Sequence, residues 1–282
     1  MDPVSIVTDS TSDLAPNVAT AHNIEVVPLS VIHADRAYLD GVDITPSSFY
    51  PMLTSSSELP KTSQPTVHQF KEVFGRLLQQ GHSVVSLHIS GGLSATKDAA
   101  RSAAAELETD RVTVIDSGFL SYGLSFQAIE ASKMAQQGCS VEEIVAMLDE
   151  MRRNTELLFT LDTMHYLHKG GRIGKVSALL GNLLNIKPVI RVEGGIYVPV
   201  AKCRSSRQAL ATIVQYLTDR FSQQKVRLAV GHGQAEEAAR SLLEMLKQEL
   251  CVEGEPEFYE VGPVIGVHTG PGTVGAAVCP VI

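Results

Sequence analysis

The chain has 282 residues, of which 44% are hydrophobic and 19% charged, and its formal net charge is −8 at pH 7. This composition is typical of a globular protein, and the length favours two domains over a single core. The negative net charge, without any basic run, argues against nucleic-acid binding, because neutralising phosphates requires a basic face.

The first half of the chain alternates strand and helix patterns. Short runs rich in β-branched residues predict strands at 5–8, 24–32, 84–89 and 112–115, with Pro28 marking the second as an edge or irregular strand. Cap residues predict where helices begin, namely after Ser12 or Asp13, after Thr45, after Thr66, at Ser94 and after Ser140, and a further helix is expected at 122–137. This alternation predicts a parallel sheet covered on both faces.

The second half has a different pattern. A strand at 156–161 and an almost wholly apolar helix at 176–184 precede two strands, 187–193 and 196–202, joined by a two-glycine hairpin turn. Further on, the pattern predicts helices at 205–223 and 235–250 and strands at 226–230 and near both ends of 258–278. We therefore expect an α/β protein of two domains, a parallel-sheet domain at 1–155 and a mixed α+β domain at 156–282.

The stretch 83–107 is the first candidate for a binding site. An apolar strand ends in Ser90-Gly91-Gly92, and an alanine-rich helix follows from Ser94. A strand, a glycine turn and a helix start bring backbone N–H groups and hydroxyls together, which suits an anion. An ordinary strand-to-helix connection has the same appearance, so this stretch alone leaves both interpretations open.

Three other polar clusters are candidates of the same kind. Residues 9–13 follow the first strand, where a ligand crevice or simple helix capping would explain them. Thr62 and Ser63 lie in a loop held between two prolines, and His268 lies among glycines that permit close backbone approach. A lone histidine is more often a structural hydrogen-bonding group than a ligand contact.

Several chemistries find little support. The segment around Lys175 lacks the first glycine of a phosphate-binding loop, because Lys169 occupies that position. No histidine, cysteine or carboxylate spacing is typical of a metal site, and four widely spaced cysteines fit reduced thiols in the cytoplasm. No run is long enough to span a membrane, and the first residues do not have the pattern of a signal peptide.

Five segments together resemble the DegV family of bacterial fatty-acid-binding proteins. They are residues 7–14, Thr-Ser-Gln-Pro at 62–65, 88–96, 167–174 with its Gly-Gly-Arg-Ile-Gly core, and 262–272 with Gly-Pro-Val-Ile-Gly and His-Thr-Gly-Pro-Gly. The segments occur in order from end to end of the chain. The resemblance implies two α/β domains with a long-chain fatty acid between them, its carboxylate at the interdomain crevice and its tail in an apolar tunnel.

The resemblance also implies particular contacts. Thr62 and Ser94 match the first choices for hydrogen bonds to the carboxylate, with Ser63, Ser90 and His268 as possible second contacts. Arg172 matches a basic position that would assist the anion, contact a kinase, or form an ion pair that holds the loop. The usual family sequence has Ser and Gly where this chain has Gly91 and Ala95, which removes one potential hydroxyl.

We therefore predict a cytoplasmic fatty-acid carrier without catalytic residues or a cofactor. It would present the bound acid to a separate fatty acid kinase, which forms acyl phosphate for phospholipid metabolism, and it would not insert stably into membranes. Residues 176–184 and the hairpin at 189–198 are candidate tunnel walls. The alternative is a lipid ester hydrolase that uses Ser94 and His268, since Gly-x-Ser-x-Thr at 92–96 partly matches a nucleophile elbow.

Overall fold

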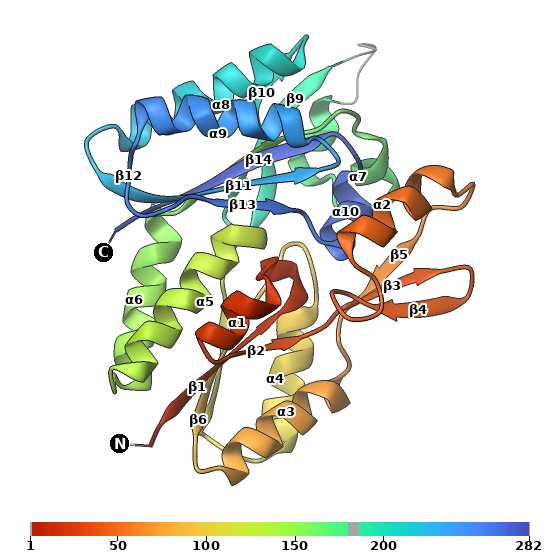
Figure 1. Ribbon diagram of the computed structural model, residues 1–282. Helices are drawn as coiled ribbons and strands as arrows, with labels where there is room; N and C mark the ends of the chain where they lie inside the picture. The colour runs from red at the N-terminus through yellow and green to blue at the C-terminus, as the bar shows by residue number, and fades with distance from the viewer. Residues whose placement is uncertain (1, 180–185, 282) are drawn as a thin grey trace.

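The computed structural model describes residues 2–179 and 186–281 (Figure 1). Its first sheet has the strand order β2-β1-β6-β7, and every pair in it is parallel. The strands are β1 (Val4–Asp9), β2 (Ile24–Val27), β6 (Ser83–His88) and β7 (Val112–Asp116). Because parallel strands share one direction, their carboxyl ends, with the polar residues that follow them, meet at one edge.

Helices cover both faces of this sheet, as its apolar strands require. On one face lie α3 (Val67–Gln79) and α4 (Thr96–Glu106), and on the other α5 (Ser121–Gln136) and α6 (Val141–Asn154). The short helix α1 (Pro16–Ala21) lies beside β2. The predicted cap at Thr66 and the predicted capping box at Ser140 are confirmed, since each side chain accepts a hydrogen bond from the backbone three residues on.

The single strand predicted at 24–32 is wrong. Pro28 has no N–H for a sheet, so β2 ends at Val27, and the N–H of Leu29 donates to the Ser10 hydroxyl at 3.1 Å. The chain then enters a separate antiparallel sheet of order β4-β3-β5. Its strands are β3 (Ser30–His33), β4 (Arg36–Leu39) and β5 (Lys61–Ser63), and the helix α2 (Pro46–Ser55) lies between β4 and β5 in the chain. This break carries Thr62 away from the main sheet.

Two predicted helix starts are also wrong. Ser10–Ser12 form a single 3-10 turn, Asp13 has a left-handed backbone (φ 57°), and α1 begins only at Pro16 without a side-chain cap. Capping therefore does not explain the polar cluster at 9–13. The helix α4 begins at Thr96 rather than at Ser94, and the residue before it, Ala95, has no side chain that could cap it.

The third sheet has seven strands in the order β10-β9-β8-β14-β11-β12, with β13 also paired to β11. Only β12 and β13 run parallel to β11, so the sheet is mixed, as predicted. Helices α8 (Ser206–Phe221) and α9 (Glu236–Glu249) cover its outer face (Figure 1). The strands are β8 (Glu156–Thr160), β9 (Lys187–Glu193), β10 (Ile196–Cys203), β11 (Lys225–Gly233), β12 (Cys251–Val252), β13 (Glu257–Glu260) and β14 (Thr273–Pro280).

The inner face of this sheet packs against the first half of the chain. A buried apolar cluster joins residues of α5 and α6 to residues of β8, β9 and β14. The short helix α10 (Pro263–Thr269) contacts α2, β3 and α7 (His165–Lys169), so it belongs by sequence to the second half but packs on both. All strands before Thr155 lie in the first two sheets, and all described strands after it lie in the third. The boundary near residue 155 remains a prediction.

The predicted apolar helix at 176–184 falls partly outside the described residues. A 3-10 helix covers Gly174–Leu179, and nothing can be said of 180–185. Among the helices described, none combines the length and the apolar character needed to cross a membrane. Within residues 2–179 and 186–281, no group of three or more histidine, cysteine or carboxylate side chains is placed to hold a metal ion.

Candidate functional site

A small cavity lies where the three sheets approach one another. Four side chains singled out from the sequence line it together: Thr62 from β5, Ser94 before α4, Arg172 after α7 and His268 from α10. Thr62 and His268 are 206 residues apart in the chain, and the distance from Thr62 Oγ1 to His268 Nε2 is 2.9 Å. The rest of the lining is mostly apolar and includes Leu29, Ile89, Leu93, Leu120, Tyr197, Val264 and Ile265.

His268 is neutral at pH 7 in this site. Burial, the larger effect, and the nearby positive charge of Arg172 together lower its pKa to about 4. Its Nε2 atom is paired with the Thr62 hydroxyl, whereas its buried Nδ1 atom has no hydrogen-bond partner in the described part of the chain. A Cβ atom at Gly170 would collide with Nδ1, so the Gly-Gly-Arg loop packs directly on this ring. The unused polar atom of the ring therefore lies on the side that faces Gly170.

Arg172 brings a formal positive charge to the cavity. Its Nη1 donates to the Gly170 carbonyl at 2.8 Å and its Nε to the Leu93 carbonyl at 3.4 Å. No ion-pair partner for it occurs among the described residues, so the salt bridge considered from the sequence is absent there. A guanidinium beside a mostly apolar cavity favours an anion at this end.

Ser94 has a free side for a ligand. Its hydroxyl lies 2.9 Å from the Thr96 hydroxyl and accepts a long hydrogen bond of 3.3 Å from the Thr96 N–H. It makes no hydrogen bond to His268, whose Nε2 atom is occupied by Thr62. The nucleophile–base pair that a hydrolase would need is therefore not formed between Ser94 and His268.

Ser63 and Ser90 do not line this cavity. The Ser63 hydroxyl donates to the Gln64 carbonyl at 3.2 Å. Ser90 is only 1% exposed. Its hydroxyl donates to the Gly195 carbonyl at 2.6 Å and accepts from the Gly92 N–H at 3.1 Å. Their placement gives no support to the expected second contacts, and Ser90 instead joins the first half of the chain to the β9–β10 hairpin.

Ser90→Ala is expected to destabilise the protein by about 1–3 kcal/mol, because it leaves the buried Gly195 carbonyl without its donor. Urea unfolding followed by circular dichroism measures this loss. Ser63→Ala is a suitable control, since its exposed hydrogen bond is local. Equal unfolding free energies for the two variants would contradict the role that we assign to Ser90.

Gly91 lies on the other side of the same loop. A Cβ atom there would be 2.5 Å from Lys97 Nζ and 3.0 Å from Asp116 Oδ2. A side chain at this position would therefore meet the Lys97–Asp116 ion pair (2.8 Å) and not the cavity. The hydroxyl that Gly91 was expected to remove from the site would not have faced it.

A second, apolar cavity adjoins the first. The two share Leu120, Tyr197 and Ile265 as walls, and the second continues between β8, β11, β14 and α10. Its lining is mostly apolar, and the hydroxyls of Thr269 and Thr273 within it are bonded to backbone carbonyls. Each cavity has a volume of only about 40 Å³. Together they form a narrow slot with one polar, positively charged end.

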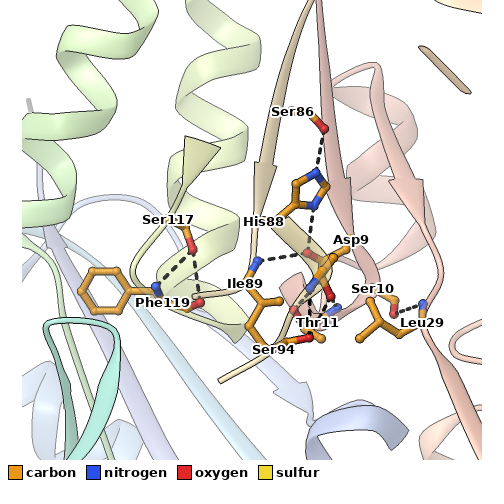
Figure 2. Close-up of polar contacts among 11 residues, drawn as sticks. Asp9, Ser10, Thr11, Leu29, Ser86, His88, Ile89, Ser94, Ser117 and Phe119 are labelled. Carbon is orange, nitrogen blue, oxygen red and sulfur yellow. Dashed lines mark hydrogen bonds and ion pairs between the residues drawn. The ribbon is translucent and has the colours of Figure 1, made fainter. Parts of the chain in front are cut away.

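Sequence reasoning missed the network that supports this end of the first sheet. Asp9 Oδ2 accepts from His88 Nδ1 and from the Ile89 N–H, both at 3.0 Å, and His88 Nε2 lies 2.7 Å from Ser86 Oγ (Figure 2). Asp9, Ser86 and His88 are all fully buried. This array resembles a catalytic triad, but it is sealed from substrate and instead fixes the strand ends before Ser90. The Asp-Ser-Thr run after the first strand was its only sequence signal.

Two acidic residues, Asp13 and Asp40, lie at the start of α10. Asp13 accepts from Ser121 Oγ at 2.5 Å and from the Gly262 N–H at 3.0 Å, which places a carboxylate at the start of this helix. Asp40 lies close to the same turn. Burial, the largest effect, and neighbouring acidic groups raise the pKa of Asp13 and of Asp40 to about 7, although the hydrogen bonds that each accepts oppose this shift. The cluster at 9–13 therefore orients the helix that carries His268.

The fold and the cavities define a two-domain α/β protein with a polar-ended apolar slot between its sheets. The chain belongs to the DegV family, because the protein-family model described as "Uncharacterised protein, DegV family" matches residues 3–281 of its sequence. A DegV domain-containing protein of Streptomyces coelicolor is 37% identical over 276 residues, which are 98% of each chain. The predicted α/β fold class and family are thereby confirmed.

Solved structures agree with this assignment. The chain is similar to a DegV family protein from Thermus thermophilus described as binding fatty acid, with a TM-score of 0.94, 35% identity and full coverage of both chains. It is also similar to a stearic-acid-binding protein from Eubacterium ventriosum, with a TM-score of 0.89, 29% identity and 98% coverage of each. These relatives are fatty-acid-binding proteins.

Proposed function

We propose that this protein binds a long-chain fatty acid in the slot between its domains. The carboxylate would lie between the Thr62 and Ser94 hydroxyls and the Arg172 guanidinium, with His268 orienting Thr62. The acyl tail would follow the second, apolar cavity. The observation that carries the proposal is that two cavities of opposite character adjoin. One contains hydroxyls and a cation, and the other, which shares three lining residues with it, is apolar.

The energetics favour such a ligand. Burying each methylene is worth about 0.8 kcal/mol, so a chain of about fifteen gains on the order of 12 kcal/mol before association costs. The two cavities of about 40 Å³ are much smaller than the roughly 300 Å³ or more of ordinary ligand pockets. Uptake therefore requires apolar side chains of the shared wall, such as Leu120 and Ile265, to move apart. The candidate wall at 189–198 includes Tyr197, which already lines both cavities.

We further propose a carrier rather than an enzyme, which delivers the acid to a separate fatty acid kinase. The similarity to fatty-acid-binding relatives supports binding, and the lack of a hydrogen bond between Ser94 and His268 disfavours ester hydrolysis. Arg172 lies at the exposed rim of the cavity, where a partner could reach it. The four cysteines are free, which suits the reducing cytoplasm in which we place the carrier.

Denaturing extraction followed by mass spectrometry tests the proposed ligand. We expect the purified protein to release fatty acid of long chain length in up to equimolar amount, because the apolar slot retains it through purification. Added palmitate should also bind and raise the melting temperature. The protein alone should consume neither ATP nor acyl ester, and acyl phosphate should appear only when a fatty acid kinase is added.

Two outcomes would contradict parts of this proposal. If the protein neither releases nor takes up fatty acid, a fatty acid is ruled out as its ligand. Hydrolysis of an acyl ester by the protein alone, abolished by Ser94→Ala, would instead favour the lipid ester hydrolase.

A further inference from the structure

A third cavity, much larger than the two acyl cavities, lies on the opposite side of the Ser90–Gly92 loop. Its volume is about 610 Å³, and it shares no lining residue with either acyl cavity. One wall is formed by the loops after β6 and β7, and the other by β9 with the tip of the β9–β10 hairpin. Its lining combines residues from both sides of the predicted boundary near residue 155, so the hollow spans the junction of the two domains. We call it the junction groove.

Four arginines from three separate elements line the junction groove. Arg152 and Arg153 come from the last turn of α6, Arg191 from β9 and Arg220 from the last turn of α8. The whole chain carries a net charge of −8, so this concentration of cations contrasts with the rest of the molecule. Three acids also line the groove, namely Asp116, Glu156 and Glu193.

The acids do not use up the donors of the arginines. Four arginines against three carboxylates leave the groove with one positive charge. Asp116 is also engaged by Lys97 at 2.8 Å and by the Gly91 and Gly118 N–H groups, which belong to its own domain. Burial raises the pKa of Glu156, although Arg220 and Arg191 oppose this, so its negative charge is costly to maintain.

Individual guanidinium groups have free hydrogen-bonding capacity. Arg220 meets Glu156 through Nε at 3.0 Å, and 42% of its side chain is exposed. Arg152 reaches Asp149 at 2.8 Å and is 43% exposed. Within the described part of the chain, Arg153 has no ion pair or side-chain hydrogen bond and faces solvent. Since each guanidinium carries five N–H donors, most of them remain available.

Helix capping explains only part of this arrangement. Arginines in a last helical turn complement the helix dipole, which accounts for the positions of Arg152, Arg153 and Arg220 along their helices. It does not account for Arg191, which comes from a strand, or for a hollow of ligand size left open among the four. Pockets of roughly 300–1,000 Å³ are those that hold small molecules.

We propose that the junction groove binds a small phosphate-bearing anion, with the guanidinium groups of both domains on its oxygens. Phosphate oxygens match the planar donor pairs of arginine, and each such bond is stronger than a neutral one. A diphosphate carries two phosphate groups, so its oxygens can be shared between arginines of the two domains. The bound anion then links the two domains at a point separate from the acyl slot.

Calorimetric titration with sodium pyrophosphate at constant ionic strength tests the proposal. We expect saturable binding to the full chain, and Arg153→Glu should weaken it by roughly tenfold or more, because one attractive contact becomes repulsive. Among the described residues Arg153 has no partner to lose, so this variant should fold normally. Arg220→Gln, which keeps a polar side chain beside Glu156, should weaken binding in the same direction.

Arg101→Glu is the matched control, because Arg101 is exposed on α4 outside the junction groove. It makes the same charge change and should leave pyrophosphate binding within about twofold, which is less than 0.5 kcal/mol. Palmitate affinity should be unchanged in Arg153→Glu, so failure here is distinguishable from failure of the acyl site. The proposal is overturned if pyrophosphate shows no saturable binding, or if Arg153→Glu and Arg101→Glu weaken it equally. Binding of an acidic peptide without binding of pyrophosphate would likewise overturn it.

Discussion

Thr62→Val and Ser94→Ala are each expected to raise the dissociation constant for palmitate by about 10- to 100-fold. Each change removes a hydroxyl that would donate to the buried carboxylate, and a hydrogen bond to a charged group is worth about 1.5–3 kcal/mol. Valine keeps the shape of threonine, so the cavity wall is preserved. Displacement of a fluorescent fatty acid measures the affinity.

Ser63→Ala supplies the matched control for this pair. It removes a hydroxyl from the residue next to Thr62, but that hydroxyl is bonded to the Gln64 carbonyl and does not line the cavity. Its affinity for palmitate should equal that of the unchanged protein. Thr62→Val also leaves His268 Nε2 without its partner, so thermal unfolding must be measured in parallel. Normal palmitate binding by both variants would rule out our placement of the carboxylate.

Asp40→Asn is expected to become increasingly stabilising as the pH rises from about 4 to about 7. Asp40 is 4% exposed, and burial raises its pKa to about 7, with smaller contributions from Asp13 and Asp9. The folded state therefore favours the protonated carboxyl. Its contribution to stability is complete below the unfolded pKa of about 3.9, falls as the pH rises, and levels off above about 7. The total loss is at most about 4 kcal/mol.

Denaturant unfolding at several pH values measures this difference. His268 acts in the opposite direction, because its pKa is lowered to about 4, but its effect cancels when variant and unchanged protein are compared at one pH. Asp35→Asn is the control, since Asp35 lies exposed in a turn between β3 and β4. If the effect of Asp40→Asn on the free energy of unfolding is independent of pH, Asp40 is not protonated by burial.

Local sequence signals predicted most individual elements of the fold. The capping boxes at Thr66 and Ser140 and the hairpin turn at Gly194-Gly195 depend on residues a few positions apart, and the structure has all three. Predictions failed where a distant contact competed with a local one. The strand predicted at 24–32 ends at Val27, and the Leu29 N–H instead donates to the Ser10 hydroxyl, 19 residues away in the chain.

The residues predicted for the candidate site also fall into two groups, those that line the cavity and those that do not. The family resemblance singled out Thr62, Ser94, Arg172 and His268, and the structure brings these four to one cavity, although their role in binding remains a proposal. Ser63 and Ser90 carried the same sequence signal and point elsewhere. A hydroxyl in a loop has no periodicity that reveals its direction, so only its partners, such as the Gly195 carbonyl 105 residues away, decide it.

The sequence by itself therefore determined the family, the parallel and mixed sheets, and a polar strand-to-helix turn at Ser90–Ser94, because these depend on local pattern and composition. Only the tertiary structure shows that Ser94 of this turn lines the small cavity, whereas Ser90 and Gly92 line the junction groove. Pro28 diverts the chain so that Thr62 reaches His268, and Asp13 holds the helix that carries this histidine. The junction groove on the other side depends on arginines from three elements that no sequence spacing relates, so only the packing of the two domains creates it.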